Sequence, residues 1–175
     1  MTTLAVGWWS QHELHTLTLL IPAVLIGLLA LGADARAWLR RRGGQLPAAP
    51  TLIAAALSVG AATVHAVVCP DHFHEGLLYG EFFAVAAGAQ LTWAGLAIFR
   101  PRRWVLAAGL AGNLAILVLW AITRTVGIPL GPQAGTIEAV GALDAVATVF
   151  EVAIVICCAW SLALALHGGR RVAIS

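Results

Sequence analysis

Five long apolar runs constrain the fold of this chain more than any other feature. They are approximately residues 14–33, 50–69, 77–99, 103–123 and 138–166. Each is long enough for a helix to cross about 30 Å of hydrocarbon, which takes roughly 20 residues. Only 10% of the 175 residues are charged, whereas about 25% are charged in an average soluble domain. The sequence therefore predicts a single all-α domain, residues 1–175, that crosses a lipid bilayer as a bundle of five transmembrane helices.

The distribution of basic residues predicts the orientation of this bundle. All ten basic residues are arginine. If the five spans alternate in direction, nine arginines lie on one side of the membrane and only Arg124 lies on the other. Cytoplasmic loops are enriched in arginine and lysine, so we expect an outer N-terminus and a cytoplasmic C-terminus. The absence of lysine excludes a retinal linkage. Nucleic-acid binding is not expected either, because the arginines cluster at the ends of apolar runs.

The densest group of chemically active side chains lies between His65 and Glu81. His65 is predicted near the outer end of the second span, which we expect Pro70 to end. The histidines that follow would then lie on a short loop, and Glu81 would lie about one turn inside the third span. Spans joined by so short a loop are antiparallel neighbours, so we expect His65 and Glu81 to meet. The candidate metal ligands of this outer-face site are His65, His72, His74, Glu75 and Glu81.

The types of these ligands indicate which metals would suit the site. Imidazole nitrogens and carboxylate oxygens favour a divalent transition metal such as Zn(II), Cu(II), Fe or Mn. A bis-histidine haem between spans needs two buried histidines, and only His65 is predicted to be buried, so no haem is expected. The HFHE pattern differs from the HExxH pattern of zinc proteases, so that mechanism has no motif to support it.

A second group of polar residues lies in the fourth and fifth spans and in the loop between them. Ionisable groups at membrane depth are rare and costly unless they are paired, protonated or hydrated. They either lock helices together as buried pairs or form a proton or ion path that leads inward from the outer site. We expect Asn113 to bond Glu151, and Arg124 to bond Asp144 or Glu138 beneath a Gly- and Pro-rich loop. The residues of this group are Asn113, Arg124, Glu138, Asp144 and Glu151.

Two pieces of the sequence resemble a group of uncharacterised multi-span integral membrane proteins of high-GC bacteria. The pieces are HAVVCPDHFHEGLLYGEFF and WAITRTVGIPLGPQAGTIEAVGALD. The resemblance covers roughly residues 60–150 and is carried mainly by the second piece. It implies the plasma membrane of a bacterium and suggests that both pieces contribute to one outer-face site. No activity is established for the group, so the resemblance implies no catalytic residues.

These observations lead to one expected function and two alternatives. The expected function is the binding of a divalent transition metal at the outer face, for handling, transport or sensing. The first alternative is an intramembrane metal-dependent enzyme, in which an open coordination position activates water. The second is a non-catalytic subunit of a membrane complex, whose polar residues only hold helices or a partner together. Five short spans enclose little polar volume, so a homodimer or a larger membrane complex is a further expectation.

Overall fold

A computed structural model describes residues 46–172 of the chain, with side chains described as far as residue 167. This part of the chain is helical, and its helices are α2 (Ala49–Glu75), α3 (Leu77–Phe99), α4 (Arg103–Thr125) and α5 (Ala142–Val172). All four are long and apolar enough to cross a membrane. The chain is therefore a multi-pass membrane protein whose helices suit a lipid bilayer. The first predicted span, residues 14–33, lies outside the described residues.

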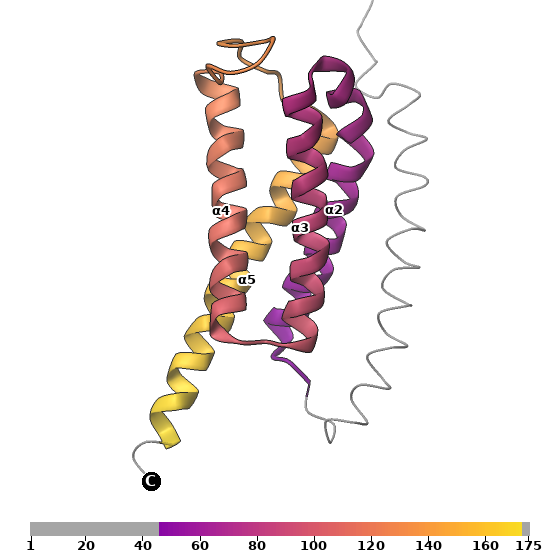
Figure 1. Ribbon diagram of the computed structural model, residues 1–175. Coiled ribbons are helices and arrows are strands. Elements are labelled where there is room, and N and C mark those ends of the chain that lie inside the picture. Colours follow the sequence, from indigo (N-terminus) through magenta and orange to yellow (C-terminus); the bar gives the residue numbers. More distant parts are fainter. Residues whose placement is uncertain (1–45, 173–175) are drawn as a thin grey trace, which may run out of the picture.

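Helices α2 and α5 form the centre of the described bundle. α2 packs along α3 and also against α5, whereas α5 packs against α4 as well. α3 and α4 contact each other only locally, and α5 crosses the bundle obliquely in Figure 1. The core is rich in small side chains, among them Ala54, Ala61, Ala94 and Ala97. Small residues let membrane helices approach closely without a hydrophobic driving force between them.

The local contact between α3 and α4 depends on one glycine. The indole of Trp93 lies directly against Gly109, where a Cβ atom would overlap the ring. The same indole Nε1 donates a hydrogen bond of 2.7 Å to the carbonyl oxygen of Val105. Gly109 therefore provides the space that lets the side chain of an α3 residue reach the α4 backbone.

Replacing Gly109 by alanine is expected to lower the free energy of unfolding by about 1–3 kcal/mol, because the added methyl group overpacks the contact with Trp93. Thermal unfolding in detergent would measure the loss. Gly112→Ala is the matched control on the same helix, since a Cβ at Gly112 meets nothing within 4 Å among the described residues. An equal loss in both variants would show that the Trp93 contact does not hold α3 and α4 together.

The second and fifth spans have different boundaries from those predicted. α2 continues through Pro70 to Glu75, so His72 and His74 lie on the last turns of a helix and not on a loop. Proline removes one backbone hydrogen bond, and membrane helices tolerate this because neighbouring helices and side chains satisfy the freed groups. α5 begins at Ala142 and not at residue 138, which leaves Glu138 in the connection from α4. The third and fourth spans were predicted to within two residues.

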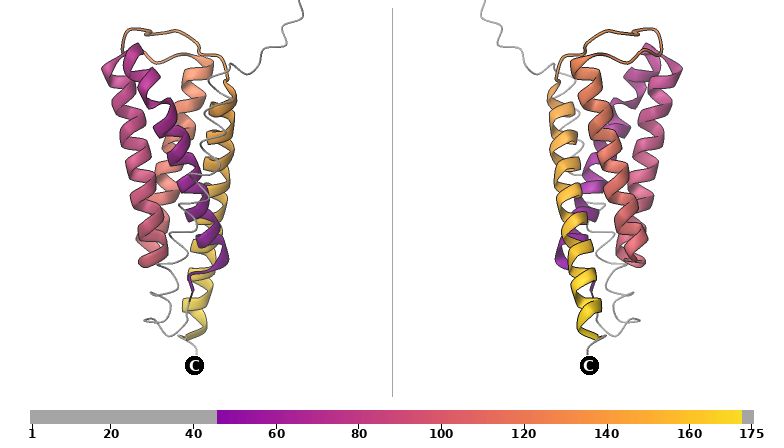
Figure 2. Two further views of the ribbon diagram at one scale, coloured as in Figure 1. Left: turned by 90° about the vertical axis from the view of Figure 1, so that its right-hand side faces the viewer. Right: turned by 90° about the vertical axis from the view of Figure 1, so that its left-hand side faces the viewer.

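The connection between α4 and α5, the 126–141 loop, covers one end of the bundle (Figures 1 and 2). It has no regular structure, yet hydrogen bonds connect its residues to one another and to α4. Gly135 N donates to Ile128 O at 2.8 Å, and Glu138 N donates to Thr123 O at 3.1 Å. Gly127 has a φ of +73°, and its Cα faces the backbone of residues 135–136. Only glycine combines that φ with so close an approach of two backbones.

Polar side chains recur every seven residues along the buried face of α2. Thr51, Ser58 and His65 are all buried, and we call them the polar stripe of α2. Seven residues are nearly two helical turns, so the three side chains share one face. Each has a polar partner on another helix: Thr51 bonds Ser161, Ser58 bonds the carbonyl oxygen of Gln90, and His65 bonds Glu151. The stripe therefore joins α2 to both α3 and α5.

Candidate functional site

A cavity of about 630 Å³ lies beneath the 126–141 loop. Residues from all four described helices and from the loop line it. Small-molecule sites usually measure about 300–1,000 Å³ and combine apolar walls with a few convergent polar groups. Most of the polar residues singled out in the sequence line this cavity. Those that line it are His65, His72, Glu75, Arg124, Glu138, Asp144 and Glu151.

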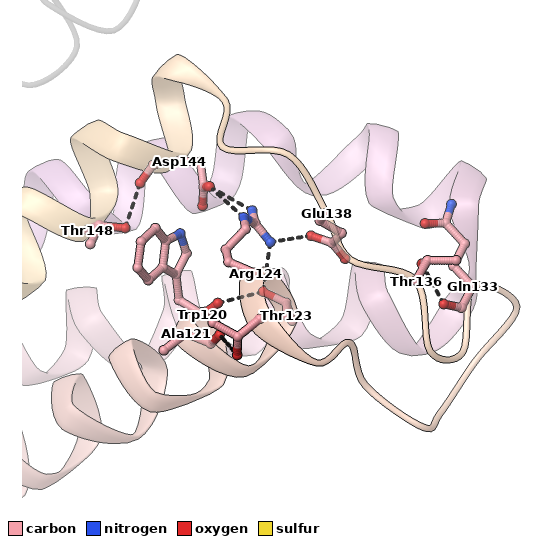
Figure 3. Close-up of polar contacts among 10 residues, drawn as sticks. Trp120, Ala121, Thr123, Arg124, Gln133, Thr136, Glu138, Asp144 and Thr148 are labelled. Carbon is pink, nitrogen blue, oxygen red and sulfur yellow. Dashed lines mark hydrogen bonds and ion pairs between the residues drawn. The ribbon is translucent and has the colours of Figure 1, made fainter.

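Arg124 lines this cavity and lies between a carboxylate of α5 and one of the 126–141 loop (Figure 3). Its Nη2 donates to Asp144 Oδ2 at 2.6 Å, and its Nη1 donates to Glu138 Oε2. The prediction that Arg124 bonds Asp144 or Glu138 is confirmed, and the guanidinium bonds both. Arg124 lies in the last turn of α4 and Asp144 in the first turn of α5. Each charge thus complements the dipole of its own helix end.

The same guanidinium has further contacts that fix its position. Its Nη1 also donates to Thr123 Oγ1 at 2.7 Å, and its Cζ lies 6.0 Å from the centre of the Trp120 ring. Its side chain is only 14% exposed. A guanidinium that is nearly buried requires such a set of acceptors, because it cannot lose its charge.

Tyr79 of α3 holds the opposite side of the 126–141 loop. Its hydroxyl group donates to Leu130 O at 3.0 Å and accepts from Gln133 N at 3.4 Å. Gly131, with a φ of +82°, faces the phenol closely. Arg124 and Tyr79 therefore attach the loop at two points, one on α4 and one on α3.

His65 and Glu151 form a buried pair deeper in the bundle. His65 Nε2 lies 3.0 Å from Glu151 Oε1, and the two residues are 4% and 1% exposed. The His65 ring also packs against Phe83, with 5.5 Å between ring centres. His65 Nδ1 is buried and has no hydrogen-bond partner among the described residues. Both residues were candidates in the sequence, but their pairing was not predicted.

His72 lies two turns beyond His65 on α2 and lines the same cavity. Its Nδ1 lies 2.8 Å from Val68 O, and its ring packs on Phe83 with 3.9 Å between ring centres. A carbonyl oxygen can only accept, so Nδ1 carries the proton and Nε2 is left with a lone pair. Phe83 thus contacts both histidines of the cavity.

The five predicted metal ligands do not come together in the described part of the chain. No three His, Cys, Asp or Glu side chains among residues 46–167 are grouped closely enough to hold a metal ion. His74 and Glu81 are exposed and do not line the cavity. The expected contact between His65 and Glu81 is wrong, since His65 bonds Glu151. Because α2 continues to Glu75, His65 lies roughly 15 Å below the end of its helix, whereas Glu81 lies roughly 6 Å from the start of α3.

The expected bond between Asn113 and Glu151 is also wrong. Asn113 Oδ1 accepts a hydrogen bond from Gln90 Nε2 at 3.5 Å, and its Nδ2 donates to Gly109 O at 2.8 Å. The later start of α5 places Glu151 roughly 14 Å from that helix end, which is level with His65. Asn113 therefore contributes to a contact between α3 and α4 and not to the cavity.

No protein-family model matches the chain, and neither a curated protein nor a solved structure matches it. Five carboxyl groups and one guanidinium line the cavity, which gives a formal charge of −4 with the histidines neutral. The carboxyl groups are those of Asp71, Glu75, Glu138, Asp144 and Glu151, and the guanidinium is that of Arg124.

Proposed function

We propose that this protein binds a cation in the cavity beneath the 126–141 loop. The observation that carries the proposal is the excess of carboxyl groups over basic groups in the cavity wall. Arg124 is bonded to Asp144 and Glu138, and His65 is bonded to Glu151, so neither of these groups is bonded to Asp71 or Glu75. Carboxylates at membrane depth are costly unless a proton, a partner or a bound cation compensates them.

The proposed setting is the outer face of a bacterial plasma membrane. The α3–α4 turn carries Arg100, Arg102 and Arg103, and Arg124 lies at the other end of the bundle. Positive-inside asymmetry supports an orientation with that turn in the cytoplasm and the 126–141 loop outside. One chain supplies the whole described lining, so binding does not require the homodimer or larger complex considered above.

Cysteine labelling tests this orientation. In a variant without the three native cysteines, Gln133→Cys should react with a membrane-impermeant maleimide added to intact cells. Arg100→Cys should react only after the cells are opened. Both positions are exposed, so a difference in labelling reports sidedness and not burial. The reverse pattern would place the cavity at the cytoplasmic face.

A divalent transition metal is one candidate for the bound cation, as the sequence suggested. His72 has one ring nitrogen bonded to a carbonyl oxygen, and His65 has one bonded to a carboxylate. Metal-binding histidines are commonly held in this way, with the second nitrogen facing the metal. Zn(II), Cu(II), Fe or Mn would each accept one such nitrogen together with a carboxylate oxygen. Handling, transport or sensing of such an ion requires no catalytic group, whereas an intramembrane enzyme also requires an open position on the metal.

Cation binding can be tested by thermal unfolding of the purified protein in detergent. A ligand that binds only the folded state at 100 times its Kd stabilises it by about 2.7 kcal/mol. We expect at least one cation from a panel of Zn²⁺, Mn²⁺ and phenethylammonium to raise the Tm of the wild type. Glu75→Gln should reduce the shift, because Glu75 lines the cavity. Glu81→Gln is the matched control at the same end of the bundle, outside the cavity lining.

Elemental analysis of the purified wild type and of His65→Ala would show whether a metal copurifies and depends on the cavity. If no cation in the panel changes the Tm and no metal copurifies, the cation-binding proposal fails. The buried pairs would then serve only to hold helices together, as expected of a non-catalytic subunit.

A further inference from the structure

The cavity is large for a metal ion and lacks a converged set of metal ligands. Its volume of about 630 Å³ lies in the range of sites for small organic molecules. No three potential ligands are grouped within the described residues. Phe83 packs against both histidine rings, so an aromatic side chain contacts the same groups that a metal would need. These features favour a cation with an organic body.

Aromatic rings on two helices contribute to the cavity wall. They are Tyr79, Phe82 and Phe83 of α3 and Trp120 of α4. A cation near the face of such a ring is attracted by the negative charge of the π-system, more strongly where water is excluded. Trp120 already contacts the Arg124 guanidinium in this way. Aliphatic side chains such as Leu78, Ile116 and Leu119 complete the wall and suit the apolar part of a ligand.

The unpartnered nitrogen of His65 indicates which polar group the ligand presents. In the neutral tautomer whose Nε2–H donates to the Glu151 carboxylate, His65 Nδ1 is an acceptor. This Nδ1 belongs to a side chain that lines the cavity, and it has no donor among the described residues. A buried acceptor without a donor is unfavourable, because it has lost its hydrogen bonds to water. An N–H donor on the ligand would satisfy it.

We propose that the cation is a protonated organic amine with an apolar body. Its ammonium group would donate to His65 Nδ1, while the Glu151 carboxylate stays bonded to the opposite ring nitrogen and holds that tautomer. Its apolar body would pack against Phe83 and Trp120. This assignment rests on the proposed cation-binding function and names the ligand class for the same cavity. Carboxylates supply the opposite charge, the aromatic rings supply cation–π contacts, and the histidine supplies an acceptor that selects an N–H group.

The assignment can be tested by calorimetric titration of the full-length protein in detergent with four probes. Phenethylammonium carries both an N–H cation and an aromatic body, whereas 2-phenylethanol has the same body without a charge. Phenyltrimethylammonium has the charge without an N–H group, and Zn²⁺ has no organic body. We expect phenethylammonium to bind most tightly, phenyltrimethylammonium about tenfold more weakly, and 2-phenylethanol not detectably.

Two variants connect binding to the cavity. Glu151→Gln removes the charge at nearly constant shape, and Phe83→Leu removes the aromatic face. Each should weaken phenethylammonium binding about tenfold or more, while Glu81→Gln should bind as the wild type does. If Glu151→Gln does not fold, the Phe83→Leu result and the comparison of probes still decide the question.

Each other outcome contradicts a different part of the argument. Binding of Zn²⁺ without phenethylammonium would overturn the amine assignment and leave the cation-binding function in place. Equal binding of 2-phenylethanol and phenethylammonium would show that the cavity does not select charge, which also overturns the assignment. Binding of no cation at all would overturn both.

Discussion

Replacing Arg124 by alanine is expected to lower the free energy of unfolding by about 3 kcal/mol, the lower end of the range for breaking a buried ion pair. The guanidinium bonds Asp144, Glu138 and Thr123, and alanine would leave the Asp144 carboxylate without its cation. Glu138 is more exposed than Asp144, so water replaces its lost bond more readily. Most of the effect should therefore come from Asp144. Unfolding by denaturant or heat in detergent would measure the effect.

Two further variants distinguish the role of Arg124 from that of an ordinary surface charge. Arg124→Lys keeps the charge but cannot reach three acceptors with a planar fork, so it should recover only part of the stability. Arg100→Ala, an exposed arginine at the other end of the bundle, should change stability little. If Arg124→Ala unfolds at the same temperature as the wild type, the guanidinium does not fix the 126–141 loop.

His65→Leu is expected to lower the free energy of unfolding by about 3–5 kcal/mol, because it leaves the Glu151 carboxyl group buried without a partner. Glu151→Leu should be less damaging, since it leaves a neutral imidazole whose lost hydrogen bond costs about 1–3 kcal/mol. The double variant His65→Leu/Glu151→Leu should recover most of the loss. Replacing a whole buried ion pair by apolar side chains is often neutral or stabilising.

This set of variants separates stability from function at the same pair. If the pair binds a ligand, the double variant should be as stable as the wild type and yet bind no cation. A double variant that is stable and retains full cation binding would place the ligand elsewhere. Strict additivity of the two single losses would instead show that His65 and Glu151 are not coupled.

The spans were predictable because their signal is compositional. The third and fourth apolar runs agree with α3 and α4 to within two residues, since charged residues and Pro101 lie at their ends. The Arg124 ion pairs were predictable for a related reason. The predicted alternation of spans puts Arg124 on the side opposite to the other nine arginines, where it needs local carboxylates, and Glu138 and Asp144 are the next acidic residues along the chain.

The contacts of His65 were not predictable because they depend on one helix end. Proline in a soluble helix usually ends it, and ending α2 at Pro70 would place His65 near Glu81. The helix continues for five further residues, which lowers His65 by more than one turn relative to the membrane face. The same reasoning applies to Glu151, which is less deep than predicted because α5 begins at Ala142 and not at residue 138. Counting both from the observed helix ends places them at the same level.

The cavity could not be predicted from the sequence. Its shape depends on the local contact between α3 and α4 near Trp93 and Gly109. The distance between two helices cannot be predicted from the periodicity of either one. The polar groups on its wall were recognisable as a set because ionisable residues are rare in spans. Which of them face the same space, as Asp71 and Glu75 do and Glu81 does not, requires the rotation of each helix.

The polar stripe of α2 has a consequence for the order of events during synthesis of the chain. Its ionisable member, His65, bonds a residue 86 positions later in the sequence. At about 5–20 residues per second, translation of that interval takes roughly 4–17 s. α2 leaves the ribosome during this interval, before Glu151 is synthesised. Until then, the polar groups of the stripe must form hydrogen bonds with the insertion machinery, with water or with an early neighbour such as α3. A chain that stopped before α5 would leave Thr51 and His65 without Ser161 and Glu151, the partners that they have in the complete bundle.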